Sequence, residues 1–339
     1  MTKLLIVTDA WRPQINGVVR SLERLGVELT KIGVQVDFLT PAEFITLPCP
    51  TYPEIRLALT TKGRIARRID KAKPDFVHVA TEGPLGLMTR KAVNGNGPGF
   101  TTSYHTRFPE YLSARLPVPE RWSYAWLRRF HNHGLGCMVA TDSLKQLLQR
   151  QGFANLMTWS RGVDQELFYP RKDKVYDLPR PIFLNVGRIA VEKNLEAFLC
   201  LDLPGSKVVI GDGPQMETLK RKYPDVHFLG AKVGDDLARH YSDADVFVFP
   251  SRTDTFGNVV VEALASGVPV AAFPVMGPLD IIGDSGAGSL SEDLREAALA
   301  ALEVSRETAL ERAGAFTWEG TSRQFLDNVV EAQTRRQTN

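Results

Sequence analysis

Cysteine is scarce in this chain, and its positions exclude one class of site. The 339 residues include only Cys49, Cys137 and Cys200, which lie far apart and form no CxxC pair. This spacing argues against a zinc site and is typical of proteins kept in a reducing compartment. We therefore expect a cytoplasmic protein.

Long apolar runs are also missing. No stretch approaches the roughly 20 apolar residues that span a bilayer. The short apolar run at the start is followed at once by Asp9 and Pro13, which favours a buried first strand over a secretion signal. If a membrane is involved, we expect the protein to lie on its surface.

Net charge is low but unevenly distributed. The formal charge of the whole chain is +2. Residues 1–170 carry 22 Lys and Arg against 14 Asp and Glu, a balance of +8, whereas residues 171–339 carry 19 against 25, a balance of −6. Two interpretations stay open: chance combined with solvated faces, or a first half that meets an anionic surface.

Short β-rich runs alternate with longer amphipathic segments along the whole chain. The length, with 43% hydrophobic residues, suits two compact domains. Continuous apolar strands separated by helical segments predict parallel sheets covered on both faces. The runs are KLLIVTD, VQVDFLT, FVHVA, FTTSYH and CMVATD, then PIFLNVG, KVVIG, VHFLG, DVFVFPS and VPVAAF. They predict an α/β chain of two doubly wound, Rossmann-like domains.

A polar segment with three prolines, YPRKDKVYDLPRP at 169–181, is where we place the linker. We predict a first domain at 1–170, a second at 171–315, and a C-terminal helix in 316–339 that packs back toward the first domain. Ligands of open parallel sheets bind beyond the carboxyl ends of the strands. Two such sheets facing each other would form an interdomain cleft, so the residues just after strands are the candidates.

Two cations follow a predicted strand in NVGRIAVEKN. Arg188 comes directly after the strand, and Lys193 lies five residues on, at the expected start of a helix. Two cations beside helix amides form an oxyanion site whose natural guest is a diphosphate. Ordinary surface cations are the alternative.

Two carboxylates, Asp254 and Glu262, flank a Phe-Gly-Asn step in SRTDTFGNVVVEALASG. A helix that begins near Gly257 or Asn258 would place Asp254 in the preceding loop and Glu262 in the first turns. The two acids would lie on the order of 10 Å apart, with the amides of Gly257, Asn258 and Val259 between them. That span suits one acid on a donor sugar and one on a ribose diol. In the alternative, Asp254 caps the helix and Glu262 is solvated.

The first half offers weaker candidates. Asn16 and Gly17 lie in a strand-to-helix loop, where small side chains let a phosphate or sugar approach the backbone. His105 follows a predicted strand and precedes Arg107. A lone histidine is often a structural residue, but this position is where α/β ligands collect.

Two short motifs argue against other chemistries. The acids of DAD at 243–245 immediately precede the apolar run VFVFP, so a helix end explains them better than a metal site does. GDGP at 211–214 is a fragment of GxGxxG and lacks an acid about 20 residues further on that would read a dinucleotide ribose. We expect neither a bound metal nor NAD.

Taken together, these motifs resemble those of the retaining glycosyltransferases of family 4, which have the two-domain GT-B fold. The branch with GDP-mannose-dependent α-mannosyltransferases, diacylglycerol glycosyltransferases and sulfoquinovosyl lipid synthases is the most similar. The resemblance covers nearly the whole chain: PQINGV, SYHT, RGVDQELFYP, NVGR....KN, GDGP and SRTDTFGNVVVEALASGVPV follow in the family's order.

The resemblance implies a role for each matching residue. Arg188 and Lys193 would hold the donor diphosphate, Asp254 would lie near the donor sugar, and Glu262 would bind the ribose hydroxyls. His105 would lie beside the sugar. Gly17, with Asn16, would lie near the phosphates, and the remaining donor contacts would include Arg107, Gly213, Gly257, Asn258 and Val259.

Three positions depart from the family pattern. Asp254 replaces the commoner Glu, and PVMGPLD at 274–280 replaces a loop that usually contains Gly-Gly, which leaves the roles of Gly277 and Asp280 open. Arg107 stands where relatives often have Asp or Asn. An arginine beside the sugar site suits a carboxylate, so a uronic acid donor becomes a hypothesis.

The expected partners are a nucleotide sugar and a lipid. Without a metal cluster or cofactor, the cations and helix amides would stabilise the departing diphosphate. The segments TKGRIARRIDKAKPD and RWSYAWLRRFHNH combine cations with aromatic residues, which suits an anionic membrane surface and a peripheral enzyme with a lipid acceptor. Amphipathic helices with buried aromatic side chains are the alternative.

Rival functions remain open at this point. A GDP-mannose-dependent α-mannosyltransferase acting on a glycan precursor, a sugar-nucleotide epimerase or hydrolase, and a noncatalytic binding module would share the donor residues. Nucleic acid is not an expected partner, because the basic segments lack a reader motif. The sequence leaves the oligomeric state open.

Overall fold

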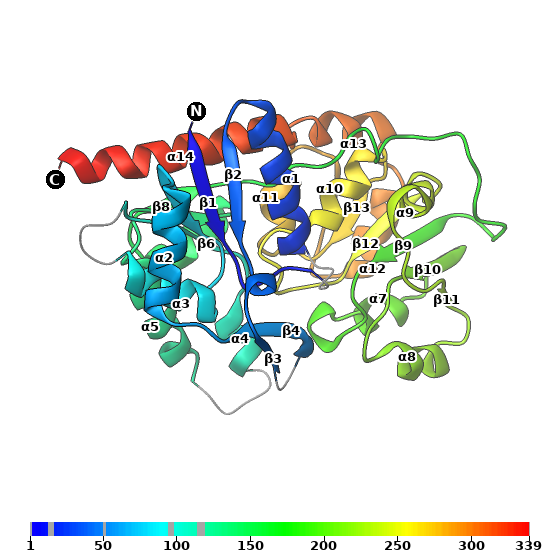
Figure 1. Cartoon of the computed structure of the whole chain (residues 1–339). Coiled ribbons are helices and arrows are strands. Elements are labelled where there is room, and N and C mark those ends of the chain that lie inside the picture. The colour runs from blue at the N-terminus through cyan, green and yellow to red at the C-terminus, as the bar shows by residue number, and fades with distance from the viewer. Residues whose placement is uncertain (1, 13–16, 50–51, 94–97, 114–118, 339) are drawn as a thin grey trace. The chain divides into compact units, whose positions relative to one another are not determined.

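The computed structural model describes residues 2–12, 17–49, 52–93, 98–113 and 119–338 (Figure 1). The chain divides into two compact units, Met1–Ser160 with Trp318–Asn339 and Arg161–Thr317. Across the described ranges, no helix combines the length and the apolar character needed to cross a membrane.

The first unit is built on a six-stranded parallel sheet in the order β2-β1-β5-β6-β7-β8. Its central strand, β1, pairs on one side with the next strand in sequence and on the other with β5, so the chain reverses direction across the sheet there. The strands are β1 (Lys3–Val7), β2 (Gln35–Leu39), β5 (Phe76–Val79), β6 (Thr101–Tyr104), β7 (Cys137–Val139) and β8 (Leu156–Thr158).

Helices cover both faces of this sheet, because alternate side chains of its central strands are apolar on both sides. Leu4 and Ile6 of β1 pack with α1 (Gly17–Lys31) and α14 (Trp318–Thr338). Leu5 and Val7 pack on the other face with α2, α3 and α5. The remaining helices of the unit are η1 (Pro41–Glu43), α2 (Lys62–Ala72), α3 (Pro84–Ala92), α4 (Phe108–Ser113), α5 (Glu120–His131) and α6 (Asp142–Arg150).

An antiparallel hairpin of β3 (Thr46–Cys49) and β4 (Tyr52–Ala58) is attached to the first unit. Ala58 is buried in the core beside the sheet. Because side chains alternate along a strand, Leu47 and Leu57, which are paired in register, lie on the opposite face from Ala58. The outer face of the hairpin is therefore apolar.

The second unit repeats the architecture with a parallel sheet in the order β11-β10-β9-β12-β13-β14. Val246 and Val248 of β12 pack in a core that contains residues of α7, α8 and α12, whereas Phe247 faces Tyr241 of α9. The strands are β9 (Ile182–Val186), β10 (Ser206–Ile210), β11 (His227–Phe228), β12 (Val246–Phe249), β13 (Val270–Ala272) and β14 (Gly288–Leu290). The helices are η2 (Val191–Lys193), α7 (Glu196–Leu199), α8 (Met216–Lys222), α9 (Gly234–Ser242), α10 (Asn258–Ala265), α11 (Pro278–Ile281), α12 (Leu294–Ala301) and α13 (Arg306–Ala313).

The boundary between the units falls at 160/161, ten residues before the predicted 170/171. Residues 161–170 belong to the second unit because they bind to its core. The Val163 amide donates to the Phe316 carbonyl, and the Phe168 ring packs edge-on against Tyr241, with ring centroids 5.6 Å apart. At the other end of the chain, α14 contributes Phe325 and Val329 to the core of the first unit.

Candidate functional site

The strongest candidates meet at one point of the second sheet. Its strand order changes direction between β9 and β12, and parallel sheets bind ligands outside the carboxyl ends of the strands at such a point. Arg188 and Lys193 follow β9, and Asp254 follows β12. The sheet therefore places Asp254 at the same edge as Arg188 and Lys193, although Asp254 lies 61 residues after Lys193 in the sequence.

Lys193 and Asp254 form a direct ion pair. The Lys193 Nζ atom lies 2.6 Å from Asp254 Oδ1, and the two side chains are 30% and 17% exposed. The second carboxylate oxygen, Oδ2, is buried and accepts no hydrogen bond from the described residues. The cation expected at the diphosphate and the acid expected at the sugar are thus in contact with each other.

The loop that carries Lys193 is fixed on the loop that carries Asp254. Asn194 donates from Nδ2 to the Pro250 carbonyl at 3.1 Å, and Thr253 donates from its hydroxyl to the Glu192 carbonyl at 3.3 Å. Asn194 adopts a left-handed backbone conformation with φ of 51°, which asparagine tolerates better than most residues. Its positioning role was missed from the sequence, although it is part of the NVGR....KN motif.

Arg188 is exposed, and the residues on either side of it form hydrogen bonds with Ile210 and with the GDGP segment that follows Ile210. The Gly187 amide donates to the Ile210 carbonyl at 3.0 Å, and the Ile189 amide donates to the Asp212 carbonyl at 2.9 Å. A Cβ atom on Gly213 would lie 2.4 Å from the Ile189 carbonyl oxygen, so this close approach requires glycine. Gly213 thus supports the Arg188 loop, and its contact with a donor stays a prediction.

Helix α10 begins at Asn258. Its N-cap is Gly257, at φ of 98°, which has no side chain to cap the helix, and Asn258 and Val259 follow it. Asp254 does not cap this helix, because its Oδ1 pairs with Lys193 and its Oδ2 has no hydrogen-bond partner among the described residues, which removes the alternative considered for it. Glu262 lies in the second turn, where its Oε2 accepts a hydrogen bond from the Tyr241 hydroxyl at 3.0 Å.

The 274–280 loop supports the same helix end. Gly277 has φ of 89°, and a Cβ atom there would lie 2.5 Å from the Phe256 carbonyl oxygen. Asp280 accepts the Gly277 amide at 3.3 Å. These contacts give Gly277 and Asp280 a structural role beside Gly257.

In the first unit, the strand order changes direction between β1 and β5. The residue at this point was not predicted from the sequence. Asp9, just after β1, accepts the Leu85 amide at 2.8 Å and the Gly86 amide at 3.3 Å at the start of α3, and the Thr81 hydroxyl at 3.0 Å. Burial raises the pKa of Asp9 to about 6. The position of Asp9 at the end of the predicted strand KLLIVTD could have identified it as a candidate.

His105 and Arg107 follow β6 but have different neighbours. The His105 ring packs edge-on against Trp159, with centroids 6.0 Å apart. Arg107 pairs with Glu110 at 2.6 Å, and the Tyr124 hydroxyl donates to the same carboxylate oxygen at 2.7 Å. The Arg107 guanidinium thus already has a carboxylate partner within its own chain.

The other first-half candidates lie at the start of α1. Gly17 is exposed and is the first residue of this helix. Asn16 lies outside the described residues.

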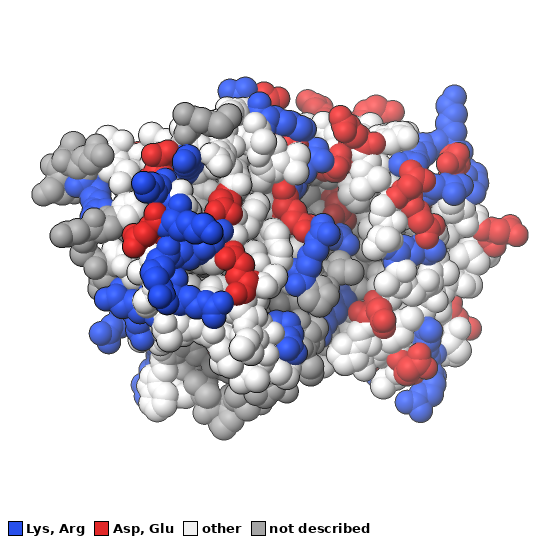
Figure 2. Space-filling view, in the orientation of Figure 1, with Lys and Arg blue, Asp and Glu red and all other residues white. Residues whose placement is uncertain are grey.

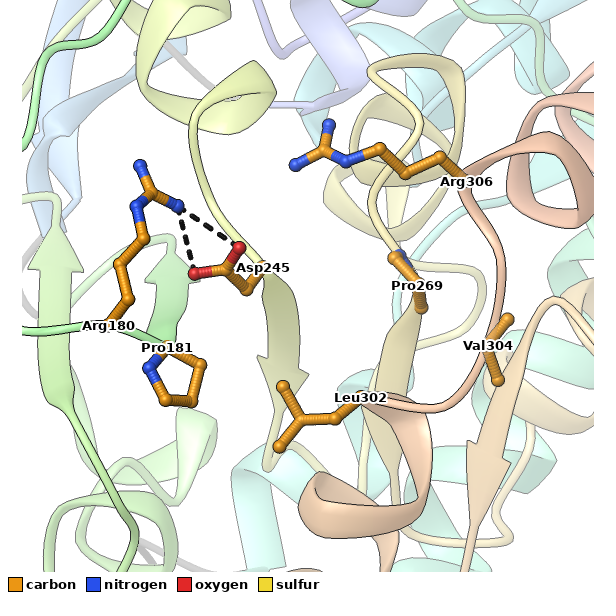
Figure 3. Close-up of a pocket in the computed structure, with 7 residues that line it drawn as sticks. All are labelled: Arg180, Pro181, Asp245, Pro269, Leu302, Val304 and Arg306. Carbon is orange, nitrogen blue, oxygen red and sulfur yellow. Dashed lines mark hydrogen bonds and ion pairs between the residues drawn. The ribbon is translucent and has the colours of Figure 1, made fainter.

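A hollow in the second unit lies at the opposite ends of the strands (Figure 3). Pro181, Asp245 and Pro269, which line it, immediately precede β9, β12 and β13. Asp245 accepts two hydrogen bonds from Arg180, and Asp243 accepts the Val175 and Tyr176 amides. The two acids of DAD therefore make structural contacts. Within the described ranges, no group of three or more His, Cys, Asp or Glu side chains forms a possible metal site.

Comparison with protein families gives two matches that together cover most of the chain. A family model described as "Glycosyltransferase Family 4" matches residues 15–167. A model described as "Glycosyl transferases group 1" matches residues 180–306.

Curated relatives match over most of the chain. A sulfoquinovosyl transferase of Arabidopsis thaliana is 30% identical over 306 residues, which is 81% of this chain and 58% of the plant protein. A GDP-mannose-dependent alpha-mannosyltransferase of Mycobacterium tuberculosis is 30% identical over 307 residues, 83% of this chain and 81% of that protein. An alpha-monoglucosyldiacylglycerol synthase of Streptococcus pneumoniae is 25% identical over 342 residues, 88% of this chain and 77% of that protein.

Solved structures share the fold. Sucrose-phosphate synthase from Thermosynechococcus elongatus has a TM-score of 0.78 at 20% identity, covering 100% of this chain and 99% of that one. HepE of Anabaena, solved in complex with UDP and glucose, has a TM-score of 0.73 at 13% identity, covering 98% of this chain and 100% of that one.

Proposed function

Because the chain belongs to glycosyltransferase family 4, we propose that it transfers a sugar from a nucleoside diphosphate donor to a membrane lipid, forming an α-glycosidic bond. Family membership and the GT-B fold confirm the resemblance of the motifs. The observation that carries the donor proposal is the Lys193–Asp254 pair in the loop before α10, whose N-cap is a glycine.

The second unit would hold the nucleotide. Helix amides and cations at a strand switch point favour an anion, and a diphosphate uses both. We assign the diphosphate to Arg188, Lys193 and the amides of Gly257, Asn258 and Val259. Glu262, further along the helix, would accept hydrogen bonds from the ribose hydroxyls.

Breaking the bond between sugar and phosphate develops negative charge on the diphosphate, and the two cations would offset that charge. In this proposal they act without a metal ion or cofactor. Lys193 already pairs with Asp254, so an incoming diphosphate competes with Asp254 for it. Once the cation is shared, Asp254 can accept a hydroxyl of the donor sugar.

The ion pair of Arg107 supports a neutral hexose rather than a hexuronic acid as the donor sugar. A uronate would have to displace Glu110, whose Oε1 atom holds both Arg107 and the Tyr124 hydroxyl. Losing that charge-assisted network would offset much of the gain from binding the uronate.

A lipid acceptor is supported by the relatives' names. The plant relative is named a sulfoquinovosyl transferase and the streptococcal one an alpha-monoglucosyldiacylglycerol synthase. We propose diacylglycerol or a glycolipid as acceptor. A GDP-mannose-dependent mannosyltransferase is the second candidate, because the relatives from Mycobacterium and Corynebacterium carry that name.

The surface of the first unit supports a peripheral position on the cytoplasmic face of an anionic membrane. Figure 2 shows Lys and Arg side chains gathered over α2. Trp122 and Trp126 of α5 are 63% and 46% exposed, whereas Tyr124 of the same helix is 4% exposed, so the alternative of buried aromatic side chains holds for Tyr124 and not for the two tryptophans. The outer face of the β3–β4 hairpin adds exposed Ile45 and Leu47. Exposed cations contribute about 1 kcal/mol each near such a surface, and exposed aromatic residues suit its interface.

One product analysis tests the proposal. The purified protein is incubated with UDP- and GDP-sugars and membrane lipid extract in chelator, and products are identified by mass spectrometry and NMR. We expect a lipid with one added hexose in α linkage. Free sugar or an epimerised nucleotide sugar would favour a hydrolase or epimerase, and a β-linked product would contradict retention of configuration.

Vesicle flotation tests the membrane position separately. We expect the protein to float with vesicles that contain anionic lipid and to float less after Trp122→Ser with Trp126→Ser. Val233→Ser, which changes an exposed residue of the second unit, is the matched control. Flotation that is independent of anionic lipid would contradict the proposed surface.

A further inference from the structure

We propose that Tyr241, a residue to which no role has been given, positions Glu262 for recognition of the donor ribose. The inference rests on the proposed function, because it takes Glu262 as the ribose ligand. Tyr241 itself is not expected to touch the substrate, since its side chain is fully buried.

The hydroxyl of Tyr241 donates its hydrogen bond to the carboxylate of Glu262. The Tyr241 hydroxyl oxygen lies 3.0 Å from Glu262 Oε2. A buried tyrosine hydroxyl needs a partner, and a bond to a charged acceptor is stronger than one between neutral groups. Glu262 is only half-buried, so this bond restricts the rotamers that its side chain can sample.

The ring of Tyr241 is held on two sides, which fixes the position of its hydroxyl. Phe168 packs edge-on against it with centroids 5.6 Å apart, and Phe247 of β12 lies tilted at 5.6 Å. Phe168 comes from RGVDQELFYP, a motif for which the donor site has no direct use. The motif thus acquires a role: it supports the ring that holds Glu262.

This arrangement leaves the carboxylate able to bind a diol. An ionised carboxylate has about four lone-pair positions, and the hydroxyl of Tyr241 takes one of them. A carboxylate can accept ribose hydroxyls, as acidic residues do in other nucleotide sites. A carboxylate fixed beforehand loses less side-chain entropy on binding, so Tyr241 should increase the preference for ribose over 2′-deoxyribose.

The test measures that preference by binding alone. Isothermal titration calorimetry gives the dissociation constants of UDP, GDP and their 2′-deoxy counterparts for each variant. For the base that the wild type prefers, we expect Tyr241→Phe to lower the ratio of 2′-deoxy to ribo dissociation constants by about three- to tenfold, which is the net contribution of a typical intramolecular hydrogen bond. Glu262→Gln should lower this ratio at least as much. Adding Tyr241→Phe to the Glu262→Gln variant should change the ratio little.

Tyr176→Phe is the matched control. Tyr176 is buried in the same unit, and its hydroxyl donates at 3.0 Å to the His240 carbonyl of the same helix, α9. This variant loses a comparable buried hydrogen bond but leaves Glu262 untouched, so its preference for ribose should equal that of the wild type. If Tyr241→Phe does not fold, Phe168→Leu, which only loosens the ring, should give a smaller drop.

Three results would overturn the inference. The preference for ribose could survive in Tyr241→Phe, it could fall equally in Tyr176→Phe, or it could be unchanged in Glu262→Gln. The same proteins are assayed for sugar transfer, so failure of the proposed function appears separately, as loss or absence of a glycosylated lipid in the wild type.

Discussion

The two units share one architecture, yet they treat the same position in opposite ways. Each has a six-stranded parallel sheet whose order changes direction between two adjacent strands. In the first unit, the helix that begins at this point, α3, already has an anion at its N-terminus, because Asp9 accepts the Leu85 and Gly86 amides. In the second unit, α10 begins at Asn258 after Gly257, which has no side chain to act as a cap, and Lys193 pairs with Asp254 of the preceding loop.

This difference supports the proposal that the second unit takes the diphosphate. A helix N-terminus attracts negative charge, but one already occupied by a carboxylate repels a second anion. Gly83 precedes α3, and a Cβ atom there would lie 2.5 Å from the Asp9 carboxyl carbon, so the occupied position is tightly packed. The fold provides two possible anion sites, and Asp9 occupies the one in the first unit.

The largest effect is expected from the cations of the second unit. Replacing Lys193 or Arg188 by Ala should lower kcat/KM by about 100- to 1000-fold, as when one preorganised group is removed from a site of developing charge. Initial rates of sugar transfer measure it. Lys222→Ala, which removes an exposed cation of the same unit that is paired with Glu196, should have wild-type rates. Equal losses in all three variants would remove the special role of this site.

The carboxylate of the first unit should make stability depend on pH. Between pH of about 4 and 6 the unfolded chain has released the Asp9 proton, whereas the folded chain, with its pKa of about 6, retains it. The free energy of unfolding should therefore fall as pH rises through this window, by about 2 to 3 kcal/mol. Above the window Asp9 should cause no further change of stability with pH.

Urea titrations followed by tryptophan fluorescence isolate this effect. All five tryptophans belong to the first unit, so their signal reports that unit alone: Trp11, Trp122, Trp126, Trp159 and Trp318. Asp9→Asn should remove the fall in stability. A wild type and a variant with parallel pH profiles would contradict the raised pKa.

Asp254→Asn should separate binding from transfer. Removing the negative charge that neutralises Lys193 should strengthen binding of the nucleoside diphosphate by about three- to tenfold, because a competing anion is lost. Sugar transfer should become slower, since the proposed sugar contact is weakened. Calorimetry and rate measurements on one preparation check both effects, and weaker binding would show that Asp254 contributes to holding the diphosphate.

The smallest effect concerns Arg107 in the first unit. Since Glu110 already neutralises this cation, Arg107→Ala should leave the preference between glucose and glucuronate donors unchanged. Competition assays with paired UDP-sugars measure it. A large loss of preference for glucuronate would restore the uronic acid hypothesis and give the first unit an anion contact of its own.

Much of this arrangement could be predicted from the sequence. Apolar runs of strand length predicted five of the six strands of each parallel sheet and missed the short edge strands β8 and β14. The Phe-Gly-Asn step predicted a helix starting near Gly257 or Asn258, and α10 begins at Asn258. Strand ends also predicted that Arg188, Lys193 and Asp254 would gather, because parallel strands end on one edge.

Contacts that depend on loop packing could not be predicted in the same way. The direct pairing of Lys193 with Asp254, the bond from Tyr241 to Glu262 and the position of Asp9 join segments with no shared periodicity. The domain boundary was misplaced for a related reason. The prolines of 169–181 indicated a break, whereas the contacts of Val163 and Phe168 decide where the second unit begins.

The most direct test of the central claim is calorimetric titration of UDP and GDP in chelator, with the wild type and with the Arg188→Ala, Lys193→Ala double variant. We predict that the wild type binds one of the two nucleotides without metal and that the double variant binds it at least about 100-fold more weakly, the loss expected when two charge-assisted contacts are removed. Undiminished binding by the double variant, or wild-type binding that vanishes in chelator and returns with magnesium, would contradict the claim.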